Sequence, residues 1–222
     1  MKTAARRSAA SLQPAAVVIG GSAGGVDALL HILSTLPAAM RVPVICMLHI
    51  PASRDSRLAA VFAPRLPVPV REAADKQSVD DATVYFAGPG YHLSVEDDHT
   101  FSLSCEAPVH FARPAIDVLM SSAADVYGED LVGILLTGAN HDGAAGMAAI
   151  AARGGFTVVQ DPAEAQVATM PRAALAAVTP DLVLNLAGIG QLLRTITVRA
   201  PAPGQTEQQT QQIPQNNQVE KP

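Results

Sequence analysis

The stretch that most constrains the fold covers residues 16–36, AVVIGGSAGGVDALLHILSTL. An apolar run at 17–19 gives way to small residues around Ser22, and apolar residues then recur at helical spacing as far as Leu36. This order predicts a strand, a tight turn and a helix. Glycines let such a turn adopt backbone angles that side chains forbid, and the start of the helix offers free N–H groups to an anion.

Three interpretations of this turn compete: a phosphate-binding loop, a site for a nucleophile at Ser22, or a plain connection. A dinucleotide-binding fold carries an acidic residue at the end of its second strand, where this chain has His49. A P-loop carries Lys followed by Ser or Thr after its glycines, where this chain has Val26 and Asp27. Both nucleotide interpretations are therefore disfavoured. The turn also satisfies the G-x-S-x-G pattern of α/β-hydrolases, but that fold places strands before its nucleophile, and no strand is predicted before residue 17.

The 222 residues, 49% of them apolar, are enough to bury the core of one domain. We expect a disordered lead at 1–14, a folded domain at 15–199 and a disordered tail at 200–222, which is rich in Gln, Asn and Pro. The net charge of −5 without a basic cluster argues against nucleic-acid binding. No signal peptide and no apolar run near the roughly 20 residues that span a bilayer are evident, so we expect a cytoplasmic protein without membrane insertion.

The remaining pattern alternates strands with helices. Strands are predicted at 42–48, 68–70, 83–87, 131–136, 156–160 and 182–184, and helices at 55–62, 114–127, 144–153, from 170 onward and at 189–196. Two alternating stretches, 92–95 and 100–103, predict an antiparallel hairpin added to the sheet. The predicted fold class is α/β: a three-layer, doubly wound domain with a mainly parallel sheet and an added antiparallel hairpin.

Three polar residues each follow the carboxyl end of a separate predicted strand: Ser22, His49 and Asp142. Parallel neighbouring strands would bring all three to one crevice, where a hydroxyl, an imidazole and a carboxylate perform nucleophilic acyl chemistry. Each residue also has a plainer explanation, since Ser22 suits a turn and Asp142 suits the cap of the Ala-rich helix that follows it. His141 also lies at a strand end, but it adjoins Asp142 and is the weaker candidate. The joint placement favours catalysis.

These residues resemble the catalytic domain of the bacterial chemotaxis protein-glutamate methylesterases, called CheB. The resemblance covers residues 16–196 and rests on several motifs in the family's order. They are IGGSAGG at 19–25, LHIP at 48–51, YFAGPGYHL at 85–93, RPAIDVL at 113–119, ILLTGANHDGAAGM at 134–147 and MPRAAL at 170–175.

The resemblance implies a catalytic triad of Ser22, His49 and Asp142. It implies a substrate as well: a glutamyl methyl ester in the cytoplasmic helical region of a chemoreceptor, hydrolysed to glutamate and methanol, with glutamine deamidation in some members. No metal or organic cofactor is implied. Two competing functions remain open, an interaction module of a chemosensory array without turnover and a small-molecule carboxylesterase.

Other positions carry weaker assignments. Backbone N–H groups near Ala23 or Ala139 are candidates for binding the oxyanion. Arg113 matches the family's Arg-Pro residue and either faces substrate or packs over a helix start. This chain departs from many relatives at Ala23, where they have Thr, and at Ala139, where they have Met. Because only about 14 residues precede the predicted domain, we expect an esterase that is not gated by its own receiver domain and is either constitutively active or controlled by a separate regulatory protein.

Overall fold

The computed structural model describes residues 12–49 and 56–198. Along the chain the elements are β1 (Ala16–Gly21), α1 (Gly25–Leu33), β2 (Val44–Leu48), α2 (Leu58–Phe62), η2 (Ala63–Arg65), β3 (Val70–Glu72), β4 (Val84–Phe86), β5 (His92–Val95), β6 (Phe101–Ser104), α3 (Ile116–Tyr127), η3 (Gly128–Asp130), β7 (Leu131–Leu135), α4 (Ala144–Ala152), β8 (Phe156–Gln160), α5 (Thr169–Ala177), β9 (Leu182–Leu184) and α6 (Leu186–Ile196). The predicted lead and tail fall largely outside the described residues.

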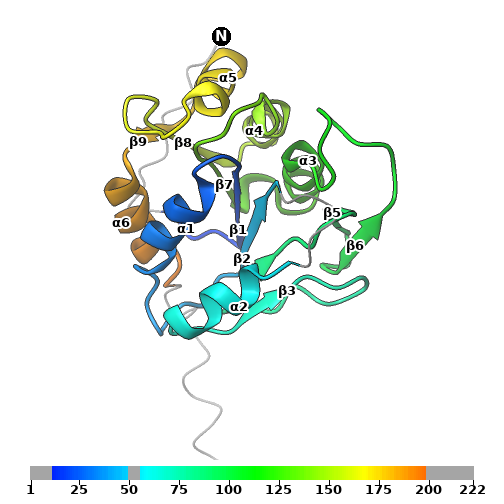
Figure 1. Cartoon of the computed structure of the whole chain (residues 1–222). Helices are drawn as coiled ribbons and strands as arrows, with labels where there is room; N and C mark the ends of the chain where they lie inside the picture. The colour runs from blue at the N-terminus through cyan, green and yellow to red at the C-terminus, as the bar shows by residue number, and fades with distance from the viewer. Residues whose placement is uncertain (1–11, 50–55, 199–222) are drawn as a thin grey trace, which may run out of the picture.

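Seven strands form one parallel sheet in the order β3-β4-β2-β1-β7-β8-β9 (Figure 1). β1 lies at the centre, where Val17 pairs with Val44 of β2 on one side and with Val132 of β7 on the other. The strand order therefore reverses direction at β1. In open α/β sheets this switch point is where a crevice opens beyond the carboxyl ends of the strands.

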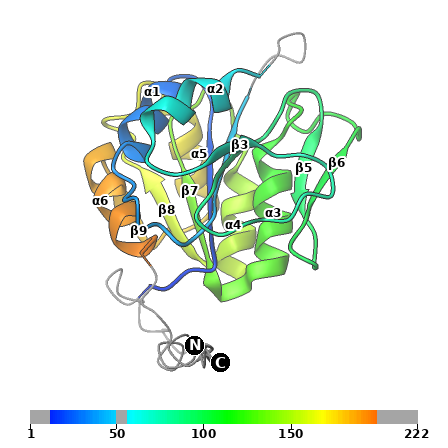
Figure 2. The same cartoon turned by 90° about the horizontal axis from the view of Figure 1, so that it is seen from below.

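Alternate residues of the central strands face two separate cores. Val17 and Ile19 pack with helices α1 and α6, whereas Ala16 and Val18 pack with α3 and α4. The two views agree that α1 and α6 lie on one side of the sheet and α3 and α4 on the other (Figures 1 and 2). Burial on both faces explains why the strands are almost continuously apolar, and the three layers confirm the predicted fold class.

The hairpin forms as predicted, with β5 antiparallel to β6, but it makes a separate two-stranded sheet. The hairpin is thus added beside the main sheet, whose edge strand β3 pairs with β4, the strand that precedes the hairpin. The hairpin lies beside α3 (Figure 2). Leu93 and Phe101 are buried in the same core cluster as the inner residues of α3.

Two helices differ from the predicted bounds for local reasons. α6 begins three residues before 189 because the Asn185 side chain accepts a hydrogen bond from the Gly188 N–H at 2.8 Å, which caps the helix. α1 ends at Leu33, short of Leu36, and the Ser34 hydroxyl donates to the His31 carbonyl in its last turn. Cys46 of β2 is fully buried, and burial raises the pKa of its thiol.

Candidate active site

Ser22 occupies the turn between β1 and α1. Its N–H donates to the Thr137 carbonyl at 2.9 Å, and its own carbonyl accepts from the Gly25 N–H at 2.8 Å. Gly24 has a φ of 78°, a left-handed angle that favours glycine. A Cβ at Gly25 would lie 2.6 Å from a Leu48 methyl, so a larger residue here would force the Leu48 side chain to move. The backbone on both sides of the serine is thereby fixed.

His49 directly follows β2 and lies between the other two predicted residues. Its Nδ1 is 3.1 Å from the Ser22 Oγ, and its Nε2 is 2.7 Å from the Asp142 Oδ2. A carboxylate only accepts hydrogen bonds, so Nε2 carries the proton and the lone pair of Nδ1 faces the serine. The ring is turned the other way round from the better-known serine proteases, in which Nε2 faces the serine.

The Asp142 carboxylate is fully buried at the start of α3. Its Oδ2 accepts the Ile116 N–H at 2.7 Å and its Oδ1 accepts the Asp117 N–H at 2.9 Å. Burial raises the pKa of this carboxyl, but hydrogen bonds from His49, Asp117 and Ile116 outweigh burial and hold the pKa below its ordinary value of 3.8. The alternative that Asp142 caps the Ala-rich helix α4 is wrong, because the side chain caps α3 instead.

Asp117, in the first turn of α3, binds a backbone N–H of α4, just as Asp142, in the loop before α4, binds backbone N–H groups of α3. Its Oδ1 accepts the Gly146 N–H of α4 at 2.7 Å, while its own N–H binds Asp142 from the loop before α4. A Cβ at Gly146 would lie 2.5 Å from the Met120 Cβ, so glycine permits the close approach of the helices. Burial raises the pKa of Asp117, opposed by the Gly146 hydrogen bond and reinforced by the charge of Asp142. Sequence reasoning missed Asp117, although an acidic residue in a first helical turn was a usable signal.

Two further buried polar residues hold the turn that carries Ser22. The Thr137 hydroxyl donates to the Ala23 carbonyl at 2.9 Å and accepts from the Val167 N–H at 2.9 Å. The Gln160 side chain accepts the Thr137 N–H at 2.8 Å. Neither residue was predicted. Their signal was the position of a polar side chain at the carboxyl end of an apolar strand.

The three weaker candidates have different surroundings. Neither the Ala23 N–H nor the Ala139 N–H forms a hydrogen bond with any other described residue, which leaves both open to an anion. The Arg113 guanidinium donates from Nη1 to the carbonyls of Cys105 and Glu106 at 2.9 and 3.0 Å. Arg113 therefore fastens the segment that leads into α3.

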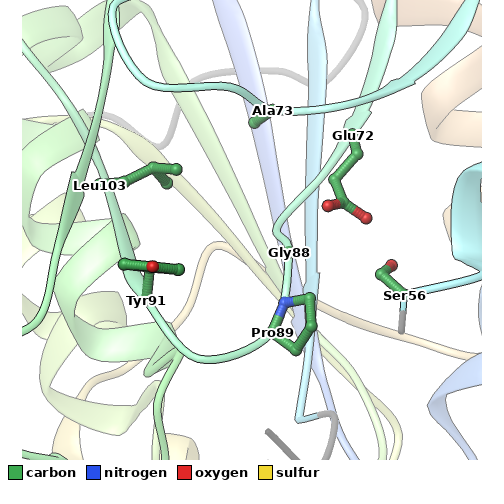
Figure 3. Close-up of a pocket in the computed structure, with 7 residues that line it drawn as sticks. All are labelled: Ser56, Glu72, Ala73, Gly88, Pro89, Tyr91 and Leu103. Carbon is green, nitrogen blue, oxygen red and sulfur yellow. The ribbon is translucent and has the colours of Figure 1, made fainter. Parts of the chain in front are cut away.

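A cavity of about 370 Å³ opens at the same edge of the sheet, over β3 and β4. Tyr91 and Leu103 line one side of it, and Glu72 and Ser56 bring polar groups to the other (Figure 3). Within residues 12–49 and 56–198, no cluster of three or more His, Cys, Asp or Glu side chains is arranged to hold a metal ion. Over the same residues, no helix has both the length and the apolar character needed to cross a membrane.

A family model described as CheB methylesterase matches residues 17–193. The chain belongs to the CheB methylesterase family. The matched region includes Ser22, His49 and Asp142, together with the helix ends that hold them.

Individual relatives agree with this CheB assignment. A Leptospira interrogans protein, provisionally named a protein-glutamate methylesterase/protein-glutamine glutaminase, is 44% identical over 177 residues, which are 80% of this chain and 92% of that protein. The Symbiobacterium thermophilum enzyme of that name is 38% identical over 70% of this chain and 43% of its own length. The crystal structure of the Thermotoga maritima CheB methylesterase catalytic domain matches 82% of this chain and 98% of its own, with a TM-score of 0.78 and 28% identity.

Proposed function

We propose that this chain hydrolyses the methyl esters of glutamate side chains in the cytoplasmic region of chemoreceptors, with Ser22 as nucleophile. The observation that carries the proposal is the position of His49, whose two ring nitrogens lie within hydrogen-bonding distance of Ser22 and Asp142. Membership of the CheB family and the names of the relatives support a protein glutamate methyl ester as the substrate, and the family resemblance supports a chemoreceptor as its carrier.

The first half of the reaction forms an ester on the enzyme. His49 Nδ1 removes the Ser22 proton as Oγ attacks the ester carbonyl carbon, and Asp142 stabilises the imidazolium that forms. The negative charge on the carbonyl oxygen falls beside the start of α1, where the Ala23 N–H, bound to no other described residue, can donate to it, and the Ala139 N–H is a second donor. Cleavage of the bond to the methoxy oxygen returns the proton from Nδ1 and releases methanol.

The second half restores the serine. His49 Nδ1 takes a proton from water, the hydroxide attacks the carbonyl carbon of the Ser22 ester, and the Oγ leaves with the proton returned from Nδ1. A glutamate side chain and the free enzyme result. The same steps with an amide substrate would release ammonia, and the relatives' names include a protein-glutamine glutaminase activity. We therefore propose glutamine deamidation as a second reaction of this site.

The decisive experiment compares methanol release from a methyl-labelled chemoreceptor fragment by the wild-type chain and by Ser22→Ala. We expect the variant to lose at least about 10³-fold in rate. Its fold should survive, because the only hydrogen bond of the Ser22 hydroxyl among the described residues is to His49. Unfolding curves of both proteins provide the control.

Two outcomes would overturn the proposal. Equal release by both proteins would exclude Ser22 as nucleophile. No release by the wild-type chain from any receptor fragment of the same cell would favour the interaction module, and turnover confined to small esters would favour the carboxylesterase.

A further inference from the structure

Phe111 stands apart from every other large apolar side chain that the structure describes. Its exposed fraction is 105%, whereas the next most exposed, Tyr91, reaches 47%. Phe111 lies in the segment 105–115, which connects β6 with the start of α3 (Figure 1). A phenyl ring held entirely in water has no role in the stability of the domain core, and this makes it a candidate contact for another molecule.

The backbone holds this ring outward in an uncommon conformation. Val109 and Ala112 exchange both N–H to carbonyl hydrogen bonds, at 3.1 and 2.9 Å, and enclose a two-residue turn. Both turn residues are left-handed, with φ of 50° at His110 and 62° at Phe111. Such turns ordinarily use Asn and Gly, and bulky residues rarely adopt these angles. Backbone outliers of this kind cluster at functional sites.

Several side chains fix the segment that carries the turn. His110 Nε2 lies 3.2 Å from the Asp117 carboxylate, and Arg113 binds two carbonyls of the segment. Buried His92 accepts the Ala115 N–H at Nδ1, at 3.2 Å, so its Nε2 carries the proton and donates to the Ala107 carbonyl at 3.1 Å. The turn is therefore built against the start of α3.

The same contacts connect the turn with the site. Asp117, which His110 contacts, donates its N–H to Asp142, and Asp142 contacts His49. Tyr91 precedes His92 in the chain and lines the cavity over β3 and β4 (Figure 3). The two most exposed Phe and Tyr rings thus lie on segments that His92 joins, and contacts through Asp117 and Asp142 connect the segment of Phe111 with His49.

We propose that Phe111 is a substrate-recognition residue that packs against apolar side chains of the receptor helix carrying the methylated glutamate. This inference rests on the proposed function. On a helix, residues three and four positions from the glutamate lie on the same face as the glutamate, so they face the enzyme surface around Ser22 when the ester reaches the serine. The chain has a net charge of −5 and offers little attraction to a glutamate-bearing segment, whereas an aromatic ring anchors a complex without charge.

The test compares Phe111→Ala with Val183→Ala in methanol release from the labelled receptor fragment. Val183 is also an exposed apolar residue, at 44%, but it lies on the edge strand β9. We expect Phe111→Ala to lower kcat/KM about 10- to 100-fold, mainly through a higher KM, because it removes the burial of one phenyl ring. Val183→Ala should retain the wild-type values, and Phe111→Tyr, which keeps the ring, should retain most of the rate.

Each remaining outcome is decisive. Wild-type kinetics in Phe111→Ala, with release still abolished by Ser22→Ala, would overturn the role of Phe111 and leave the proposed function standing. A wild-type dimer in sedimentation that Phe111→Ala dissociates would overturn it too, because the ring would then cover a second copy. A fall in kcat alone, at unchanged KM, would show that Phe111 acts on the chemistry and would also contradict recognition. Absence of Ser22-dependent release from the wild type would instead contradict the proposed function itself.

Discussion

Helices α1 and α3 both begin at the carboxyl edge of the sheet, yet their first N–H groups have opposite surroundings. Neither helix has a capping side chain of its own. At α3 the amides of Ala115, Ile116 and Asp117 are all occupied, by His92 and by the two oxygens of Asp142. At α1 the Gly25 N–H binds the Ser22 carbonyl, but the Ala23 N–H, two residues before the helix and beside Ser22, binds no other described residue.

The two helix starts use the same property, the attraction of a helix N-terminus for negative charge, in different ways. A helix N-terminus attracts negative charge, and at α3 that charge is permanent because a buried carboxylate supplies it. The occupied end holds Asp142, and through it His49, in one orientation. The open end at α1 suits a charge that exists only during the reaction. A site of this kind needs both: a closed end for positioning and an open end for the transition state.

The largest effect is expected from breaking the closed end with Asp142→Asn. An amide has one acceptor oxygen for three donors, so it cannot satisfy His49 and both α3 amides, and it favours the wrong imidazole tautomer. We expect kcat for methanol release to fall about 10²- to 10⁴-fold. The free energy of unfolding should fall by about 1–3 kcal/mol, measured in urea, because a buried N–H loses its partner.

Asp97→Asn provides the control for this change, since Asp97 is an exposed residue in the turn of the hairpin. It should leave both the rate and the stability at wild-type values. An unchanged rate in Asp142→Asn, with reduced stability, would show that Asp142 serves α3 alone.

A smaller effect is expected from loosening the open end with Thr137→Val. The substitution removes the hydroxyl that donates to the Ala23 carbonyl and accepts from the Val167 N–H. The backbone of Ala23, whose N–H lies beside Ser22, is then no longer held by this hydrogen bond. We expect kcat to fall about tenfold and stability to fall by about 1–2 kcal/mol. Thr157→Val is a matched control, because the buried Thr157 hydroxyl makes comparable bonds to Asp181, at 3.0 and 3.2 Å. If Thr137→Val and Thr157→Val reduce kcat equally, the Thr137 hydroxyl has no particular role in holding the open end at α1.

The sequence predicts the placement of Ser22, His49 and Asp142 because that placement depends on local patterns. Apolar runs mark the strands, and the carboxyl ends of parallel strands share an edge, so polar residues after those runs converge. Which helix start donates its N–H groups to Asp142 is not decided by the local sequence. Asp142 lies two residues before α4, which made α4 the obvious helix for it to cap, and only the packing of α3 against α4 brings another helix start closer.

The separation of the hairpin from the main sheet and the orientation of the His49 imidazole could not be predicted, for related reasons. Pairing of β3 with β4 decides that the hairpin stands apart, and β3 is a three-residue strand whose partner is set by the whole sheet. The ring orientation of His49 follows from the directions in which Ser22 and Asp142 approach it, which no spacing along the chain encodes. Thr137 and Gln160 were visible as polar residues at strand ends, but their bonds to the Ser22 turn require the neighbouring strands in place.

The smallest effect is expected in the pH dependence of stability, where the carboxylates of Asp142 and Asp117 should act in opposite directions. The folded-state pKa of Asp142 lies below 3.8, so its contribution is present above that pH and is lost as the pH falls through the folded-state pKa. The pKa of Asp117 lies above 3.8, so its contribution is present below that pH and is lost as the pH rises through the folded-state pKa.

Asp117→Asn should therefore change stability at about pH 7 by less than about 1 kcal/mol, because the amide oxygen still accepts the Gly146 N–H. Urea unfolding between about pH 7 and pH 3 should show that this variant loses stability more steeply on acidification than the wild type, whereas Asp142→Asn should lose it less steeply. The slopes must diverge in opposite directions. If both variants shift the slope the same way, the two carboxylates titrate as one group, and the distinction between a carboxylate held charged at α3 and one held against α4 does not stand.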